Sequence, residues 1–178
     1  NLTDEVVEAG FARWPEKVRQ AKRTQKIMET LRYRRDNLRE IARTYYEHLA
    51  KNVEVTGTND PDWFLVERDR QTTRVRVWEM KDGEKKDLMY DRTFINKETR
   101  EIRLFGFEDD DRFELKGEAG NGIRIRLIGG EGKDIFKDAS HVRGWGRKTK
   151  IHDSAEGNII DPGKEAEDLT SPETHLNQ

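Results

Sequence analysis

The sequence predicts an α+β protein in which N-terminal helices pack on a β-rich body. In the first fifty positions apolar residues recur every three or four residues, which is typical of amphipathic helices. From about residue 53 they alternate with polar residues, which is typical of half-buried strands. Beyond residue 100 short strands recur between turns rich in glycine and aspartate, which favours stacked strands of a β-roll or solenoid type.

Three helices are expected in residues 1–52. Thr3 can cap the first helix, because its hydroxyl can accept a hydrogen bond from a free amide of the first turn, and Pro15 ends that helix. Thr24 can cap the second helix in the same way. The third helix, over residues 37–51, has the clearest apolar face. The members of that face are Leu38, Ile41, Ala42, Tyr45 and Leu49.

Residues 53–152 are expected to form the β-rich domain. Its first part predicts an antiparallel meander, because residues 63–67, 73–78 and 88–94 read as strands and a Lys-Asp-Gly turn signal separates the last two. The later strands follow one another too closely for helical crossovers. They therefore either stack as coils of a β-roll or continue the meander. These short strands are 102–105, 112–115, 123–128, 134–136 and 149–151.

The composition changes again at residue 153. Residues 153–173 contain seven acidic side chains and a single basic one, Lys164, together with two prolines. A charged segment that contains proline and glycine is typical of a linker. We therefore expect residues 153–178 to be an acidic linker or tail.

The overall composition excludes several classes of function. Charged residues make up 39% of the chain, hydrophobic residues 33%, and the mean hydropathy is −1.05, so the core must be thin or confined to part of the chain. The net charge of −2 does not favour a nucleic-acid partner. The absence of cysteine excludes disulfides, thiolate metal sites and a cysteine nucleophile. We expect the chain to be a segment of a longer protein.

One turn has a chemically specific sequence. Residues 129–137 match the calcium-type nonapeptide G-G-x-G-x-D-x-U-x at every fixed position. Gly130 and Gly132 permit a tight loop whose carbonyl groups point inward. Asp134 supplies a hard anionic oxygen, and Phe136 anchors the following strand in the core. This turn is the best candidate for a metal site in the sequence.

A calcium ion binds six to eight oxygens, so a second turn has to lie beside the first. Residues 106–114 are a degraded copy of the same pattern. The copies are 23 residues apart, which is not a multiple of nine, so an insertion is expected near residues 117–122. The alternative is a turn without metal, in which aspartate bonds to its own backbone. The candidate ligands are Asp109, Asp111, Gly130, Gly132 and Asp134.

Two other features suggest binding. Residues 13–43 contain eleven basic and four acidic side chains, so they could bind phosphates, lipid headgroups or an acidic partner, or simply form a solvated helix surface. Trp63, Trp78 and Trp145 could form a ligand platform or pack on a sheet face. The four histidines lack metal-ligand spacing, and neither a G-x-S-x-G elbow nor a phosphate-binding P-loop is present. No catalytic residue is therefore assigned.

A family resemblance is carried by six segments of the chain, which are 1–9, 34–38, 45–50, 100–106, 125–130 and 151–153. Together they resemble part of the large outer-membrane proteins of Bacteroidetes-type bacteria. In those proteins a similar stretch lies between a soluble region, in some cases of calcineurin-like metallophosphoesterase type, and a surface-antigen-type β-barrel. The turn at residues 129–137 also resembles the calcium repeats of RTX hemolysins.

The resemblance implies a periplasmic or outer-membrane-associated location. We expect a non-catalytic structural or interaction module of a larger bacterial envelope protein, with calcium as a candidate stabilising ion. The alternatives are an accessory part of a phosphoesterase-like enzyme and a lipid- or glycan-binding accessory domain. The expected partners are other domains of the same longer chain, an outer-membrane β-barrel and other envelope components, and no nucleic acid.

Overall fold

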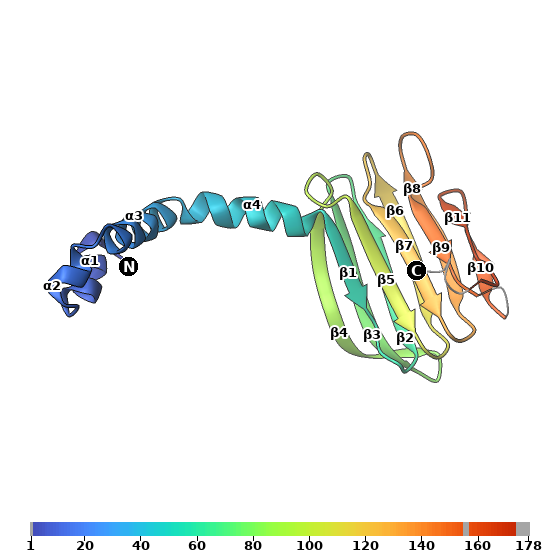
Figure 1. The fold of residues 1–178 in the computed structure, drawn as a ribbon. Helices are drawn as coiled ribbons and strands as arrows, with labels where there is room; N and C mark the ends of the chain where they lie inside the picture. The colour runs from blue at the N-terminus through green and yellow to red at the C-terminus, as the bar shows by residue number, and fades with distance from the viewer. Residues whose placement is uncertain (1, 155–156, 174–178) are drawn as a thin grey trace. The chain divides into compact units, whose positions relative to one another are not determined.

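A computed structural model describes residues 2–154 and 157–173 (Figure 1). The chain divides into two compact units, Asn1–His48 and Leu49–Gln178. The first unit is helical and the second is built almost entirely of strands, which confirms the α+β class. In the described residues, no helix has the length and apolar character that crossing a membrane requires.

The helical unit contains α1, α2, α3 and most of α4. Thr3 caps α1 as predicted, because its hydroxyl accepts a hydrogen bond from the amide of Val6 at 3.4 Å. Thr24 does not cap α3, which begins two residues earlier. Its buried hydroxyl instead donates to the carbonyl of Val18 at 2.6 Å. The helices span Asp4–Ala12 (α1), Glu16–Arg19 (α2), Lys22–Asp36 (α3) and Leu38–Ala50 (α4).

The apolar face predicted for the third helix lies on α4 and is exposed. Leu38, Ile41, Tyr45 and Leu49 have exposed fractions between 47% and 64%. Their spacing therefore identified the helix correctly but not the burial of its face. A row of exposed apolar side chains at helical spacing is a surface that another helix or sheet can cover.

The second unit is a parallel two-sheet roll. The strands form a five-stranded sheet in the order β1-β5-β7-β9-β11 and a six-stranded sheet in the order β10-β8-β6-β2-β3-β4 (Figure 1). From β4 onward, successive strands alternate between the two sheets. Apart from the antiparallel β3 and β4, neighbouring strands are parallel. The strands are Asn52–Thr56 (β1), Asp62–Arg68 (β2), Thr72–Lys81 (β3), Glu84–Ile95 (β4), Glu101–Phe107 (β5), Arg112–Ala119 (β6), Arg124–Gly130 (β7), Ile135–Val142 (β8), Thr149–His152 (β9), Ile159–Asp161 (β10) and Ala166–Asp168 (β11).

The two copies of the turn pattern are 23 residues apart, and the sequence predicted an insertion to explain that offset. In the structure the offset is one complete coil of the roll. Ile102 pairs with Ile125 in one sheet, and Phe113 pairs with Phe136 in the other. Each coil contains two strands and two turns. From β5 to β9 the chain therefore returns to the same position after 23 or 24 residues rather than after a multiple of nine. The predicted insertion near residues 117–122 is therefore wrong, since that segment is the end of β6 and the start of the turn that leads to β7 in a regular coil.

The interior of the roll is a ladder of stacked apolar side chains. The rings of Phe64, Phe113 and Phe136 stack with centroids 4.6 and 5.0 Å apart. All three are fully buried, as are Ile102 and Leu104 of the five-stranded sheet. This stack and the opposing aliphatic residues form one core cluster, and burying large side chains of this kind is the main stabilising contribution in such a fold.

The predicted meander is confirmed as β2, β3 and β4. It extends the six-stranded sheet beyond the first coil, where β3 contributes Val75 and Val77 and β4 contributes Phe94 to the core. The register of β3 and β4 shifts on both sides of Trp78, and irregularities of this kind bend a hairpin. The hairpin therefore adds apolar cover at the first-coil end of the core, as capping units do in repeat proteins.

The prediction of a linker or tail from residue 153 is wrong for residues 159–168, because β10 and β11 lie there and add a further coil. Ile160 packs against the core, and Ala166 is fully buried within it. The acidic side chains concealed the few apolar residues that make these short strands. Residues 155–156 and 174–178 of the expected linker lie outside the described residues.

A buried arginine joins the two sheets at one end of the coils. The guanidinium of Arg68 donates to the carbonyl of Ile123 at 2.7 Å and to the hydroxyls of Ser140 and Thr149 at 3.2 Å each. Burial lowers the pKa of Arg68, and the negative charge of Asp138 opposes that effect. These bonds hold the ends of β2, β8 and β9 in register.

Candidate functional site

The candidate site is a stack of four equivalent turns, each of which leads from the five-stranded to the six-stranded sheet. In three of them a glycine is followed five residues later by an aspartate, as in Gly106 and Asp111. The fourth turn has Asp153 in place of glycine and Asn158 in place of aspartate. The two positions are occupied by Gly57 and Asp62 in the first turn, by Gly106 and Asp111 in the second, by Gly129 and Asp134 in the third, and by Asp153 and Asn158 in the fourth.

The side chains at the second position form a hydrogen-bonded ladder along the stack. The amide of Asp62 donates to Oδ1 of Asp111, the amide of Asp111 to Oδ1 of Asp134, and the amide of Asp134 to Oδ1 of Asn158. Each of these three bonds is 2.8 Å long. Each bond satisfies a backbone donor at the start of a strand, so the ladder fixes one coil on the next.

The glycines are required because the aspartates occupy the space that a side chain would fill. A Cβ on Gly106 would clash with Oδ2 of Asp111, and a Cβ on Gly129 would clash with Oδ2 of Asp134. A Cβ on Gly129 would also clash with Oδ2 of Asp153. The carboxyl groups of Asp134 and Asp153 therefore meet in the interior beside Gly129.

The ladder carboxyls are deeply buried and have raised pKa values. Asp111 and Asp134 are 1% and 0% exposed. Burial is the main cause that raises the pKa of Asp111 to about 8, and it likewise raises the pKa of Asp134 to about 8. Burial also raises the pKa of Asp153, whose carboxyl interacts with that of Asp134. Two carboxylate oxygens repel, so a proton or a cation has to lie between Asp134 and Asp153.

The structure brings together two of the five predicted metal ligands, Asp111 and Asp134, in adjacent turns. Asp109 is exposed on the outside of its turn. Gly130 and Gly132 have φ angles of 115° and 139°, which side chains rarely adopt, and lie against carbonyl oxygens of the preceding turn. In residues 2–154 and 157–173, no group of three or more acidic, histidine or cysteine side chains has the arrangement of a metal site.

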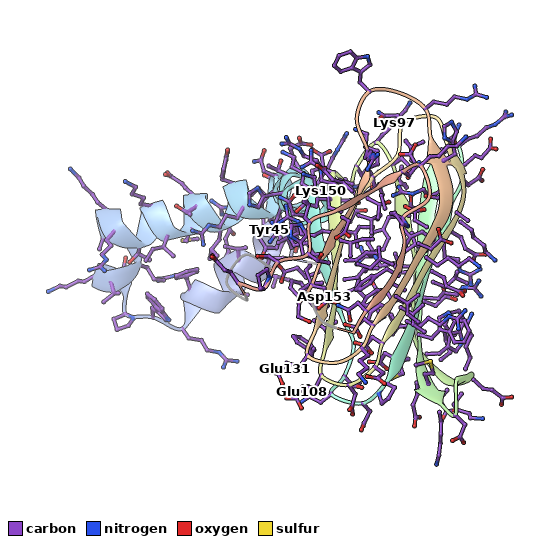
Figure 2. The ribbon with its side chains drawn as sticks, turned by 90° about the vertical axis from the view of Figure 1, so that its right-hand side faces the viewer. Tyr45, Lys97, Glu108, Glu131, Lys150 and Asp153 are labelled. Carbon is purple, nitrogen blue, oxygen red and sulfur yellow. The ribbon has the colours of Figure 1, made fainter. Side chains whose placement is uncertain are left out.

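The remaining polar groups of the two turns bind one another. The amide of Lys133 donates to Oδ1 of Asp110 at 2.8 Å, and the amide of Glu131 donates to the carbonyl of Phe107 at 2.7 Å. Glu108 and Glu131 lie close together at the same end of the second unit (Figure 2). These hydrogen bonds join the second turn of the stack to the third.

Sequence reasoning missed two members of the ladder, Asp62 and Asn158, and also Asp153, whose carboxyl meets that of Asp134. The sequence signal that would have found the turns is a shorter repeat than the nonapeptide. In this repeat a glycine is followed five residues later by an aspartate, and a large apolar residue lies two positions after the aspartate. Ladder partners are 49, 23 and 24 residues apart. The first interval is longer because the β3–β4 hairpin is inserted between the first two coils.

The three tryptophans that could form a ligand platform do not lie together in the fold. Trp63 and Trp78 pair directly across β2 and β3, whereas Trp145 is 99% exposed on the loop between β8 and β9. The ammonium of Lys85 lies 4.4 and 4.3 Å from the ring centroids of Trp63 and Trp78. The guanidinium of Arg112 lies 4.1 Å from the ring centroid of Trp63. The chain's own cations thus contact these rings, which favours packing on the sheet face.

Comparison of the chain with protein-family models, with curated proteins and with solved structures found no match.

Proposed function

We propose that this chain is a non-catalytic structural and interaction module of a larger bacterial envelope protein. The observation that supports this proposal is the aspartate ladder. Its carboxyl groups lie inside the roll and accept hydrogen bonds from the backbone, so their chemistry is used to stack coils. A stack of this kind is a rigid spacer that can hold neighbouring domains apart.

The interaction part of the proposal is supported by α4. Its exposed apolar side chains include Leu38 and Tyr45, which are 62% and 64% exposed. Other domains of the same longer chain, an outer-membrane β-barrel or other envelope components are the proposed partners. Fractionation of cells that contain the full-length protein tests the proposed location in the cell envelope. The proposal predicts recovery with the envelope, and recovery in the cytosol would contradict it.

The alternative, an accessory part of a phosphoesterase-like enzyme, is tested by hydrolysis of p-nitrophenyl phosphate and its bis ester. The chain is assayed with magnesium, manganese and zinc. The proposal predicts no turnover above the buffer rate. Turnover that is lost in Asp110→Ala, at the turn where Oδ1 of Asp110 accepts from Lys133, would overturn the non-catalytic assignment.

Calcium stabilisation is the second candidate, and one observation favours it. Oδ2 of Asp111, Asp134 and Asp153 is buried without a hydrogen-bond partner in the described part of the chain. A cation near Asp134 and Asp153 would relieve the repulsion between those carboxylates at high pH. Calcium would then raise the melting temperature at pH 8, EDTA would reverse the rise, and Asp134→Asn would abolish it. A melting temperature that ignores both additions would contradict calcium binding.

A further inference from the structure

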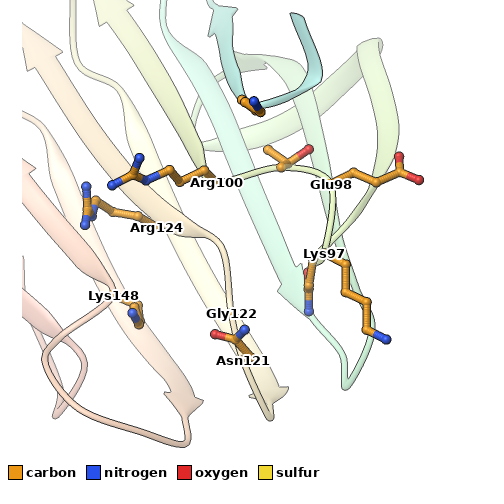
Figure 3. A pocket seen from close by; sticks show the side chains of 10 residues that line it. Lys97, Glu98, Arg100, Asn121, Gly122, Arg124 and Lys148 are labelled. Atoms are coloured by element: carbon orange, nitrogen blue, oxygen red, sulfur yellow. The ribbon is translucent and has the colours of Figure 1, made fainter. Parts of the chain in front are cut away.

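A pocket lined by several basic side chains lies at the opposite end of the coils from the aspartate ladder. This pocket of about 450 Å³ is formed by segments that are far apart in the sequence (Figure 3). Its lining includes five basic side chains and one acidic side chain, a formal net charge of +4. The basic residues are Lys51, Lys97, Arg100, Arg124 and Lys148.

The fold brings these residues together through the hydrogen bonds that begin the strands. The amide of Arg100 donates to the carbonyl of Lys51 at 2.8 Å, and the amide of Arg124 donates to the carbonyl of Arg100 at 3.1 Å. The amide of Ile125 donates to the carbonyl of Lys148 at 2.8 Å. The roll therefore places one basic residue at the start of each of four neighbouring parallel strands, β1, β5, β7 and β9. Lys97 joins them from the turn that follows β4.

Among the described residues, four of these five cations have no carboxylate partner. Arg124 pairs with Glu101 at 3.2 Å, and among the described residues it is the one basic residue of the pocket that has a carboxylate partner. Lys51, Lys97 and Arg100 are exposed, whereas Lys148 is partly buried. Like charges held together without counter-charges attract anions and raise their local concentration.

The chemistry of the lining selects the class of anion. Lysine and arginine donate charge-assisted hydrogen bonds, which are strongest to phosphate and carboxylate oxygens. Asn121 from the turn between β6 and β7 adds an amide, and Figure 3 shows it in the lining together with Lys148 and Arg124. Several cations spread around a pocket of this size match a group with two or more negative charges better than a single carboxylate.

We propose that this pocket binds a phosphate-bearing ligand with at least two negative charges. The ligand is either a soluble phosphorylated molecule or the phosphorylated headgroup of a lipid. The proposal does not depend on the module being a spacer, since it rests on the pocket alone. It also differs from a site on the basic helical segment, because every lining residue belongs to the second unit.

The test is binding of two probes to the full 178-residue chain. Isothermal titration with inorganic pyrophosphate represents the soluble source, and co-sedimentation with phosphatidylcholine vesicles that contain phosphatidic acid represents the lipid source. Binding of either probe should weaken as sodium chloride rises, because screening shortens the range of the attraction. Binding to pyrophosphate identifies a soluble ligand, and binding confined to the vesicles identifies a lipid headgroup.

A charge-reversal variant locates the site. Lys97→Glu with Lys148→Glu brings the formal charge of the lining from +4 to zero, and should weaken binding by about tenfold or more. Lys164→Glu is the matched control at an exposed position on the turn after β10, and should leave the affinity within about twofold of the original chain. If the reversal unfolds the chain, as circular dichroism would show, the glutamine double variant at the same positions replaces it.

Two results would overturn the proposal. One is that the original chain binds neither pyrophosphate nor the vesicles at low salt. The other is that it binds and that the double variant binds as tightly as the Lys164→Glu control, which would place the binding elsewhere.

Discussion

Replacing Asp111 by asparagine should stabilise the protein at pH 8. The side chain of Asp111 accepts a hydrogen bond from the amide of Asp62 at 2.8 Å, and the asparagine oxygen can accept the same bond. Asn158 already occupies the equivalent position in the last rung of the ladder. The new amide nitrogen would take the place of Oδ2 of Asp111, and a Cβ on Gly106 would clash with both that oxygen and the carbonyl oxygen of Gly129, which can serve as an acceptor for the amide. The substitution therefore removes a charge without removing the rung.

The magnitude follows from the pKa of Asp111, which burial raises from 3.8 to about 8. Between these values the folded chain holds a proton on Asp111 that the unfolded chain has released. Stability from this group is therefore fully present below pH 3.8 and is lost as the pH rises through about 8. Each tenfold difference in proton affinity corresponds to about 1.4 kcal/mol, so the group makes the fold about 5 kcal/mol less stable at pH 8 than at pH 4.

Urea denaturation in EDTA buffers at pH 5 and pH 8 measures this effect. The Asp111→Asn variant should be more stable than the original chain at pH 8 by several kcal/mol, and the difference should shrink at pH 5. Asp110→Asn is the control, because it makes the same change of charge one position earlier at an exposed side chain. The reasoning fails if the variant is the less stable protein at pH 8, or if the difference between the two chains is the same at both pH values.

Other substitutions test the packing of the coils. Gly129→Ala should destabilise the protein by about 3 kcal/mol or prevent folding, because the new methyl group would meet two buried carboxyl oxygens. Gly120→Ala, where a methyl group meets nothing within 4 Å, should change stability by less than about 1 kcal/mol in the same urea titration; equal effects at both glycines would contradict the ladder geometry. Phe113→Ala removes the middle ring of the stack and should cost about 3–5 kcal/mol. Trp145→Ala, at a side chain that is 99% exposed, should change the melting temperature very little, and a large loss of stability there would show that Trp145 packs on the body.

The sequence predicted the fold class and most strands because their periodicity is local. The alternation around Val75 and Val77 and the apolar run at Ile125 each identify a strand without knowledge of its partner. β1 was missed because its few residues directly follow the last turn of α4, where the helical pattern dominates. The segment around Ile160 was missed because its acidic composition outweighed a short apolar stretch.

The site was predicted in part because only its glycine and aspartate positions are visible in a single turn. Asp111 and Asp134 were identified through a nonapeptide pattern, and they do lie in adjacent turns. That pattern implied a coil of nine residues, whereas the coil length depends on pairing between distant strands and is 23 or 24 residues. Asp62 could not be recognised by a regular interval, because the β3–β4 hairpin separates it from the next rung.

The central claim is that Asp111 and Asp134 are structural groups of the ladder that hold protons in the folded protein at neutral pH. The most direct test is a pH titration of the ¹³Cγ chemical shift of Asp111 by NMR in EDTA buffer. The ladder predicts a midpoint near pH 8, set by burial. A midpoint near the ordinary value of 3.8 would show that the carboxyl is ionised at neutral pH, and would contradict the claim that burial keeps it protonated.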